Sequence, residues 1–106
     1  MISQQKINVA ADLLMASASI RKVILFGSYA RGDATECSDV DFLVVENDVA
    51  SKVTEMVRLR RILRPLRLPF DVMVVSEDDI EEWGDLPGSA LYWALKEGKV
   101  LQDAVA

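Results

Sequence analysis

Apolar residues along the 106-residue chain follow two patterns, helical spacing and short continuous runs. Residues 3–18 carry apolar positions at steps of three and four, which predicts an amphipathic helix. Residues 22–26 (KVILF) form an uninterrupted run rich in β-branched and aromatic side chains, which predicts a strand in the middle of a sheet. Residues 39–46 (DVDFLVVE) and 70–75 (FDVMVV) predict a second and a third strand by the same reasoning.

A long amphipathic helix is predicted between the second and third strands. It would begin at Asn47-Asp48, a pair that can cap a helix, and run to about Leu66 with apolar residues at helical spacing. Pro65 and Pro69 mark its end, because proline disfavours continuation of a helix.

The C-terminal third predicts two more helices. Ser76 and Asp79 have the spacing of a capping box before a short acidic helix, DDIEEW. SALYWALKEG predicts a last helix that stops at Gly98, and the following KVLQD fits a short final strand. The whole pattern predicts one α/β (α+β) domain over residues 1–106, with a mixed three- to four-stranded sheet flanked by helices.

Composition narrows the chemistry. The net charge of −5 argues against direct nucleic-acid binding, and the absence of histidine removes histidine-based catalysis and most zinc sites. The single cysteine, Cys37, cannot form an internal disulfide, which favours a reducing cytoplasm. The chain shows neither the layout of a signal peptide nor an apolar run of the ~20 residues that a membrane-spanning helix needs. We therefore expect a cytoplasmic protein with no membrane contact.

Two aspartates interrupt the second predicted strand. Side chains alternate across a strand, so Asp39 and Asp41 share one face, and Asp71 opens the third strand on the corresponding face. If the two strands are neighbours, three carboxylates converge. Oxygen-only ligands favour Mg²⁺ or Mn²⁺, and a pair of such ions would clamp the attacking and leaving oxygens of a phosphoryl transfer. The third carboxylate would serve the acceptor hydroxyl, through a metal or as general base.

Gly27-Ser28 ends the first predicted strand and leads into a helical turn. Such a turn presents backbone N–H groups, the glycine permits close approach of a phosphate, and Ser28 adds a hydroxyl donor. Arg31 follows within one turn and could reach the same anion. We therefore expect a phosphate site just before the paired aspartates.

The run GSYARGDATECSDVDFLVV resembles the minimal nucleotidyltransferase family of the DNA polymerase β-like superfamily. Members of that family carry Gly-Ser-x-Ala-Arg-Gly, a five-residue spacer and Ser-Asp-x-Asp, and a third acid on a later strand. The fixed positions are filled here by Gly27, Ser28, Ala30, Arg31, Gly32, Ser38, Asp39 and Asp41, and Asp71 suits the third acid.

The resemblance implies roles for these residues. Gly27 and Ser28 would hold the triphosphate of ATP, with Arg31 and Ser38 helping or bracing the loop. Asp39 and Asp41 would bind two Mg²⁺ ions, and Asp71 would join them and serve the acceptor. The reaction would transfer a nucleoside monophosphate and release pyrophosphate.

The sequence specifies the acceptor less closely than it specifies the residues of the site. Minimal nucleotidyltransferases are commonly paired with a HEPN-type RNase toxin, which they silence as antitoxins by adenylylating a tyrosine, so a hetero-oligomer with such a toxin is expected. Two alternatives stay open at this point. The chain could neutralise its partner by complex formation alone, or it could modify a small molecule such as an aminoglycoside.

Arginines gather in and after the third predicted helix. Arg60 lies close to the apolar stripe of that helix, whereas Arg58 and Arg61 point away from it. The sequence allows either a solvated face or contact with phosphates or an acidic partner surface.

Overall fold

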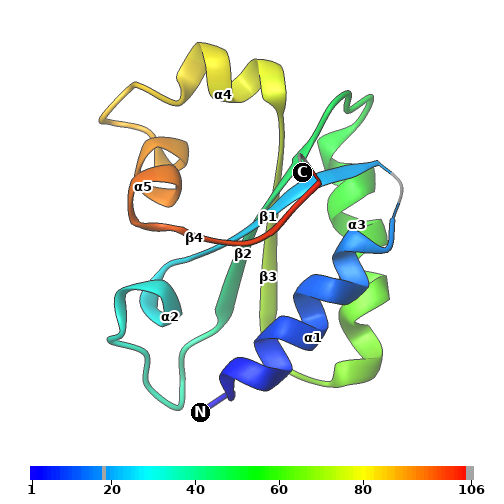
Figure 1. Cartoon of the computed structure of the whole chain (residues 1–106), viewed down its shortest axis with the longest axis vertical. Coiled ribbons are helices and arrows are strands. Elements are labelled where there is room, and N and C mark those ends of the chain that lie inside the picture. Colours follow the sequence, from blue (N-terminus) through cyan, green and yellow to red (C-terminus); the bar gives the residue numbers. More distant parts are fainter. Residues whose placement is uncertain (18, 105–106) are drawn as a thin grey trace.

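A four-stranded mixed sheet with helices on both faces forms the centre of the computed structural model (Figure 1). The structure describes residues 1–17 and 19–104. The elements in chain order are α1 (Gln4–Met15), β1 (Ile20–Phe26), α2 (Ser28–Arg31), β2 (Val40–Glu46), α3 (Lys52–Leu63), the 3₁₀ turn η1 (Arg64–Leu66), β3 (Phe70–Ser76), α4 (Glu77–Trp83), α5 (Ala90–Glu97) and β4 (Lys99–Asp103). The predicted α+β class and sheet size are confirmed.

The strand order is β3-β2-β1-β4, so β1 is an interior strand, as its continuous apolar run predicts. β1 pairs antiparallel with β2 and with β4, whereas β2 and β3 are parallel. Parallel neighbours need a crossover, and α3 with η1 provides it. Because β2 and β3 run in the same direction, both begin at the same edge of the sheet.

Alternation along β2 divides its side chains between two apolar clusters. Val40, Phe42 and Val44 face the cluster that α1 and α3 cover, whereas Leu43 and Val45 face the cluster under α5. In Figure 1, α1 and α3 lie on one side of the sheet and α4 and α5 on the other. Asp41 lies on the α5 side of β2. Further along the strand, both faces of β2 are covered by packed apolar residues.

Two helix boundaries differ from the sequence prediction. The helix expected from Asn47-Asp48 begins at Lys52, because the Oγ atom of Ser51 accepts the N–H of Thr54 at 3.3 Å and is the actual N-cap. It ends as an α-helix at Leu63, and its last turn tightens into η1 around Pro65. The N-terminal helix ends at Met15, and the predicted end at residue 18 lies outside the described residues.

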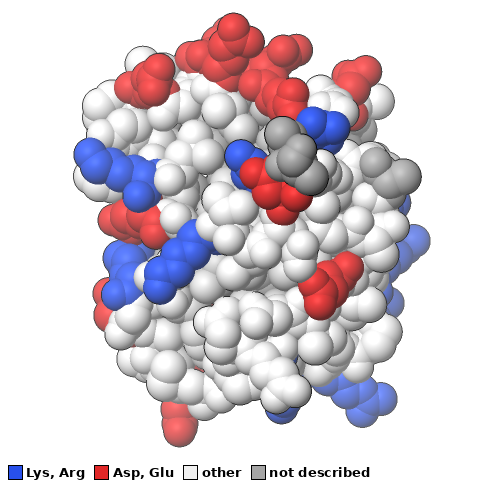
Figure 2. Space-filling view, viewed as in Figure 1, with Lys and Arg blue, Asp and Glu red and all other residues white. Residues whose placement is uncertain are grey.

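The C-terminal predictions are confirmed. Ser76 and Asp79 form a capping box at the start of α4, and KVLQD forms β4. Figure 2 shows the acidic side chains of α4 gathered at one end of the molecule. Within the described ranges, no helix has the length and apolar character that crossing a membrane requires.

Candidate active site

Asp41 and Asp71 lie side by side at the edge where β2 and β3 begin. The two strands are in register, with Asp41 opposite Asp71 and Phe42 opposite Val72. Asp71 is the second residue of β3, and Asp41 is the second residue of β2. Side chains opposite each other in neighbouring strands share a face, so the two carboxylates project from the same side of the sheet. The paired acids predicted from the two strands are therefore neighbours.

Asp41 is the electrostatic centre of this group. Burial raises the pKa of Asp41, and the nearby carboxylates of Asp71 and then Asp39 raise it further, while Arg31 acts in the opposite direction. Asp41 is partly buried, whereas Asp39 and Asp71 are exposed. Asp41 thus lies within electrostatic reach of the other two carboxylates, a repulsion that a bound cation would relieve.

Gly27 lies directly against the Asp41 carboxylate. Its backbone has φ +74°, and a Cβ at this position would collide with Oδ2 of Asp41. Phe26, the residue before it, pairs with Asp41 across the β1–β2 ladder. A residue with a side chain would therefore be both strained and in collision, which explains why the strand must end in glycine here. The turn and the acid share one corner of the molecule.

The residues after Gly27 shape the turn. Ser28 starts the one-turn helix α2, whose first N–H groups have no partner within the helix. Ala30 is buried in the α1/α3 cluster, and Gly32 ends the turn in the left-handed conformation at φ +84°. The Gly-Ser-x-Ala-Arg-Gly spacing thus satisfies backbone and packing demands as well as presenting the turn to Asp41.

Arg31 and Ser38 make structural contacts. The Arg31 guanidinium donates to Asp33 at 3.2 Å and to Glu97 of α5 at 3.4 Å, which braces the turn against the last helix. Ser38 accepts the N–H of Thr35 at 2.9 Å through its Oγ atom and so closes the loop before β2. The contact with Glu97 has no signal in the sequence, because it joins segments 66 positions apart.

Arg60 is the residue of this site that the sequence did not assign. Its Nη2 donates to Oδ1 of Asp71 at 2.9 Å. The helical wheel places Arg60 near the apolar stripe of α3, and the sequence allows solvent, phosphate or a partner as its surroundings. The pairing becomes visible only when the structure places α3 against β3.

Comparison with known proteins places this arrangement in a family. The model of the nucleotidyltransferase domain matches residues 11–103, which contain the turn and all three acids. The chain belongs to the nucleotidyltransferase domain family.

Relatives of this nucleotidyltransferase carry more specific names. MJ0604 of Methanocaldococcus jannaschii, named as a candidate protein adenylyltransferase, is 37% identical over 87 residues, which are 77% of this chain and 78% of that protein. MJ0141 of the same organism, named in the same way, is 40% identical over 53 residues, covering 50% of this chain and 52% of its own length.

Two solved structures have the same fold. A chain from a toxin–antitoxin complex with AMP-PNP aligns with a TM-score of 0.65 at 21% identity, over 96% of this chain and 74% of its own. A chain from a complex of tri-AMPylated Shewanella oneidensis HEPN toxin with its MNT antitoxin aligns with a TM-score of 0.60 at 19% identity, over 96% and 73%. At these low sequence identities, the similarity is evidence of a shared fold.

Membership in this family implies a nucleoside triphosphate substrate and a divalent metal ion. Within residues 1–17 and 19–104, no three carboxylate or thiol side chains are already placed to enclose an ion. Mg²⁺ is usually held by one or two carboxylates and completes its shell with water and substrate phosphates. Asp41 and Asp71, opposite each other on neighbouring strands, fit that manner of binding, because all the donors are oxygens and a cation would relieve the repulsion that raises the pKa of Asp41.

Proposed function

We propose that this nucleotidyltransferase transfers AMP from ATP to a tyrosine hydroxyl of a HEPN-type RNase toxin and acts as its antitoxin. The observation that carries the proposal is the meeting of Gly27 with the Asp41 carboxylate, beside Asp71 in register on the next strand. A phosphate-binding turn and a set of carboxylates in one corner are what nucleotidyl transfer requires. The relatives named as protein adenylyltransferases support a protein acceptor.

The residues of the site have separate roles in the proposed reaction. The N–H groups and hydroxyl of the turn at Gly27 and Ser28 would hold the triphosphate, and Asp39 and Asp41 would hold Mg²⁺ or Mn²⁺ beside it. The bound cation supplies charge neutralisation at the phosphates. The acceptor oxygen forms a bond to the α-phosphorus while the bond from that phosphorus to the bridging oxygen breaks, and pyrophosphate leaves. Asp71 takes the acceptor proton.

A labelling experiment tests the proposal. The purified chain, a HEPN-type partner, Mg²⁺ and α-labelled ATP are incubated, and the label on the partner is measured after gel separation and located by mass spectrometry. We expect label on a tyrosine of the partner and a loss on the order of a hundredfold or more for the Asp39→Asn, Asp41→Asn variant. The matched control is Asp78→Asn, Asp85→Asn, which removes two exposed acids of the α4 region and leaves labelling unchanged.

Other outcomes point elsewhere. Equal labelling by the wild type and the Asp39, Asp41 double variant would contradict catalysis at this site. Neutralisation of the toxin by that double variant would show that complex formation suffices. Modification of an aminoglycoside by the chain, with no label on the protein, would favour a small-molecule acceptor.

A further inference from the structure

We propose that Arg60 is a positioning residue that holds the Asp71 carboxylate in place for the acceptor. This inference rests on the proposed function, because there Asp71 is the acid that receives the acceptor proton. The contact behind it is the hydrogen bond from Nη2 of Arg60 to Oδ1 of Asp71, 2.9 Å long.

Asp71 needs an external restraint. It lies near the start of β3, an edge strand of the sheet, and its side chain is 58% exposed. The neighbour across the ladder is another carboxylate, Asp41, and like charges repel each other. Among the described residues, the bond from Arg60 is the one hydrogen bond that the Asp71 side chain makes. It occupies Oδ1 and leaves Oδ2 for the acceptor.

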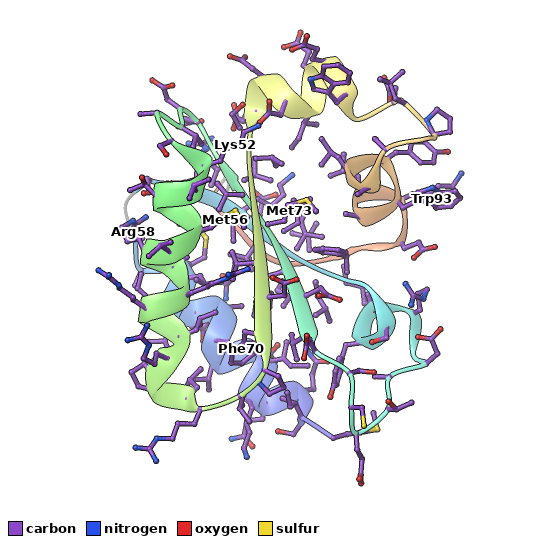
Figure 3. All side chains as sticks on the ribbon, turned by 180° about the vertical axis from the view of Figure 1, so that it is seen from behind. Lys52, Met56, Arg58, Phe70, Met73 and Trp93 are labelled. Atoms are coloured by element: carbon purple, nitrogen blue, oxygen red, sulfur yellow. The ribbon has the colours of Figure 1, made fainter. Side chains whose placement is uncertain are left out.

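Arg60 is well placed to supply that restraint. On α3 its neighbours Leu59 and Leu63 are buried at 0% and 2% exposure, so the backbone that carries Arg60 is anchored in the core. α3 packs against β3, and Figure 3 shows Phe70, the residue before Asp71, near the end of β3 that faces the last turns of α3. A planar guanidinium directed at a carboxylate fixes orientation as well as charge.

The other arginines of this region do not share the role. Arg58 is directed to Glu55, Ser17 and Ser19, and in Figure 3 it lies on the outer side of α3. In the part of the chain that the structure describes, the side chains of Arg61, Arg64 and Arg67 make no hydrogen bond or ion pair. Arg60 is therefore distinguished by its contact and not by its charge, and Arg61 provides a matched control.

Kinetics of AMP transfer separate positioning from a structural role. We expect Arg60→Gln to lower kcat about fivefold, less than the 10- to 100-fold typical of residues that orient buried ligands, because the pair is half exposed. KM for ATP stays within about twofold, since the turn that holds the triphosphate is untouched. Arg60→Lys recovers part of kcat, and Arg61→Gln leaves both constants unchanged.

A double-mutant cycle tests whether Arg60 acts through Asp71. Arg60→Gln added to Asp71→Asn should cause no further loss of kcat, because the group that Arg60 positions is gone. Additive losses, or equal losses in Arg60→Gln and Arg61→Gln, would overturn the proposal. So would a rise in KM for ATP that accounts for the whole effect, since that places Arg60 on the nucleotide.

A spectroscopic measurement keeps the inference separate from the proposed function. Side-chain ¹⁵N NMR of the full chain should show slowed rotation of the Arg60 guanidinium in the wild type and in Arg61→Gln, and free rotation in Asp71→Asn. Free rotation in the wild type contradicts the pairing, whatever the activity. A wild type that shows the pairing yet labels no partner contradicts the proposed function instead.

Discussion

Strand β2 carries a carboxylate cluster at each of its two ends, and α3 provides an arginine to both. At the N-terminal end of β2, Asp41 lies beside Asp71, which is bound by Arg60. At the C-terminal end of β2, Glu46 interacts with Glu55, which is bound by Arg58. Burial is the largest cause that raises the pKa of both Asp41 and Glu46. By pKa alone the two ends look alike.

Their surroundings differ. Glu46 is 1% exposed, and the Arg58 guanidinium ties Glu55 to the α1–β1 connection through hydrogen bonds of 2.9 and 2.7 Å to Glu55 and of 2.9 Å to Ser17. Asp41 is only partly buried, and its carboxylate lies directly against the backbone of Gly27. A raised pKa therefore marks a candidate binding site only where the acid is accessible to a ligand; at Glu46 it accompanies nearly complete burial beside the Glu55–Arg58 pair.

Removing each buried acid should separate the two ends most clearly. We expect Asp41→Asn to lower AMP transfer by on the order of a hundredfold or more, because it removes the innermost ligand of the cation and its phosphates. Glu46→Gln, a change of the same kind at the other end of the strand, should keep transfer within about twofold of wild type. Initial rates with α-labelled ATP measure both. Similar losses of transfer activity in the two variants would mean that the two ends of β2 are functionally equivalent, which would contradict the difference drawn between them.

A pair of glycine variants tests whether the close approach of the turn to Asp41 matters. Gly27→Ala puts a methyl group into the Asp41 carboxylate at a positive φ, so we expect at least about a tenfold loss of transfer and a stability cost of roughly 1–3 kcal/mol. Gly32→Ala has the same backbone strain at φ +84° but no atom within 4 Å of the added Cβ. It should cost about 1 kcal/mol with transfer retained. Urea denaturation measures the stability of both variants, and initial rates measure their transfer activity. If both variants lost the same transfer activity, the effect would come from backbone strain and not from the collision with Asp41.

Much of this geometry could be predicted from the sequence, because it follows from periodicity along single elements. The turn at Gly27 needs only the end of an apolar run, and the place of Asp41 needs only the alternation of a strand, whereas Asp39, predicted on the same face, lies just before β2. The four elements of the sheet, including β4, were predictable in the same way. The start of α3 was not, because Asn47-Asp48 and Ser51 offer equally good caps and the sequence does not choose between them.

Contacts between elements could not be predicted from the sequence. The register that sets Asp41 opposite Asp71 depends on β2 and β3 being neighbours, and the bond from Arg60 to Asp71 depends on how α3 crosses them. Glu46 gave no signal either, since it ends an apolar strand as many solvent-facing residues do. Its burial brings it beside Ser19, a residue far away in the sequence. Pairings of this kind require the topology first.

The two arginines should differ in stability as the two acids differ in activity. Arg58→Gln breaks the bonds to Glu55, Ser17 and Ser19 and leaves acids facing each other near a buried carboxyl, so we expect a loss of about 1–3 kcal/mol in unfolding free energy. Arg60→Gln should change stability by about 0.5 kcal/mol or less, because its ion pair is half exposed. Urea denaturation at neutral pH measures both, and a larger loss for Arg60 would reverse the assignment of structural and functional ends.

The smallest expected effect is a change in the pH dependence of stability at Glu46. Because burial raises the pKa of Glu46 above its ordinary 4.5, the folded state holds this proton more tightly than the unfolded chain does. Its contribution to stability is complete below about pH 4.5 and is lost as the pH rises through the higher pKa of the folded state. Glu55 has the opposite sign: contact with Arg58 lowers its pKa, so its contribution is lost as the pH falls below its ordinary range.

Glu46→Gln should therefore match wild type near pH 4 and become the more stable protein as the pH rises above the ordinary range of a glutamate, by about 1.4 kcal/mol for each pH unit by which the folded state raises the pKa. Urea denaturation at each pH gives the difference, and Asp48→Asn, at an exposed acid beyond the end of β2, provides the flat control. Asp41→Asn should show the same sign, because burial and the neighbouring carboxylates also raise the pKa of Asp41. A stability difference from wild type that shrinks as the pH rises, in either variant, would contradict the raised pKa of the acid that the variant removes.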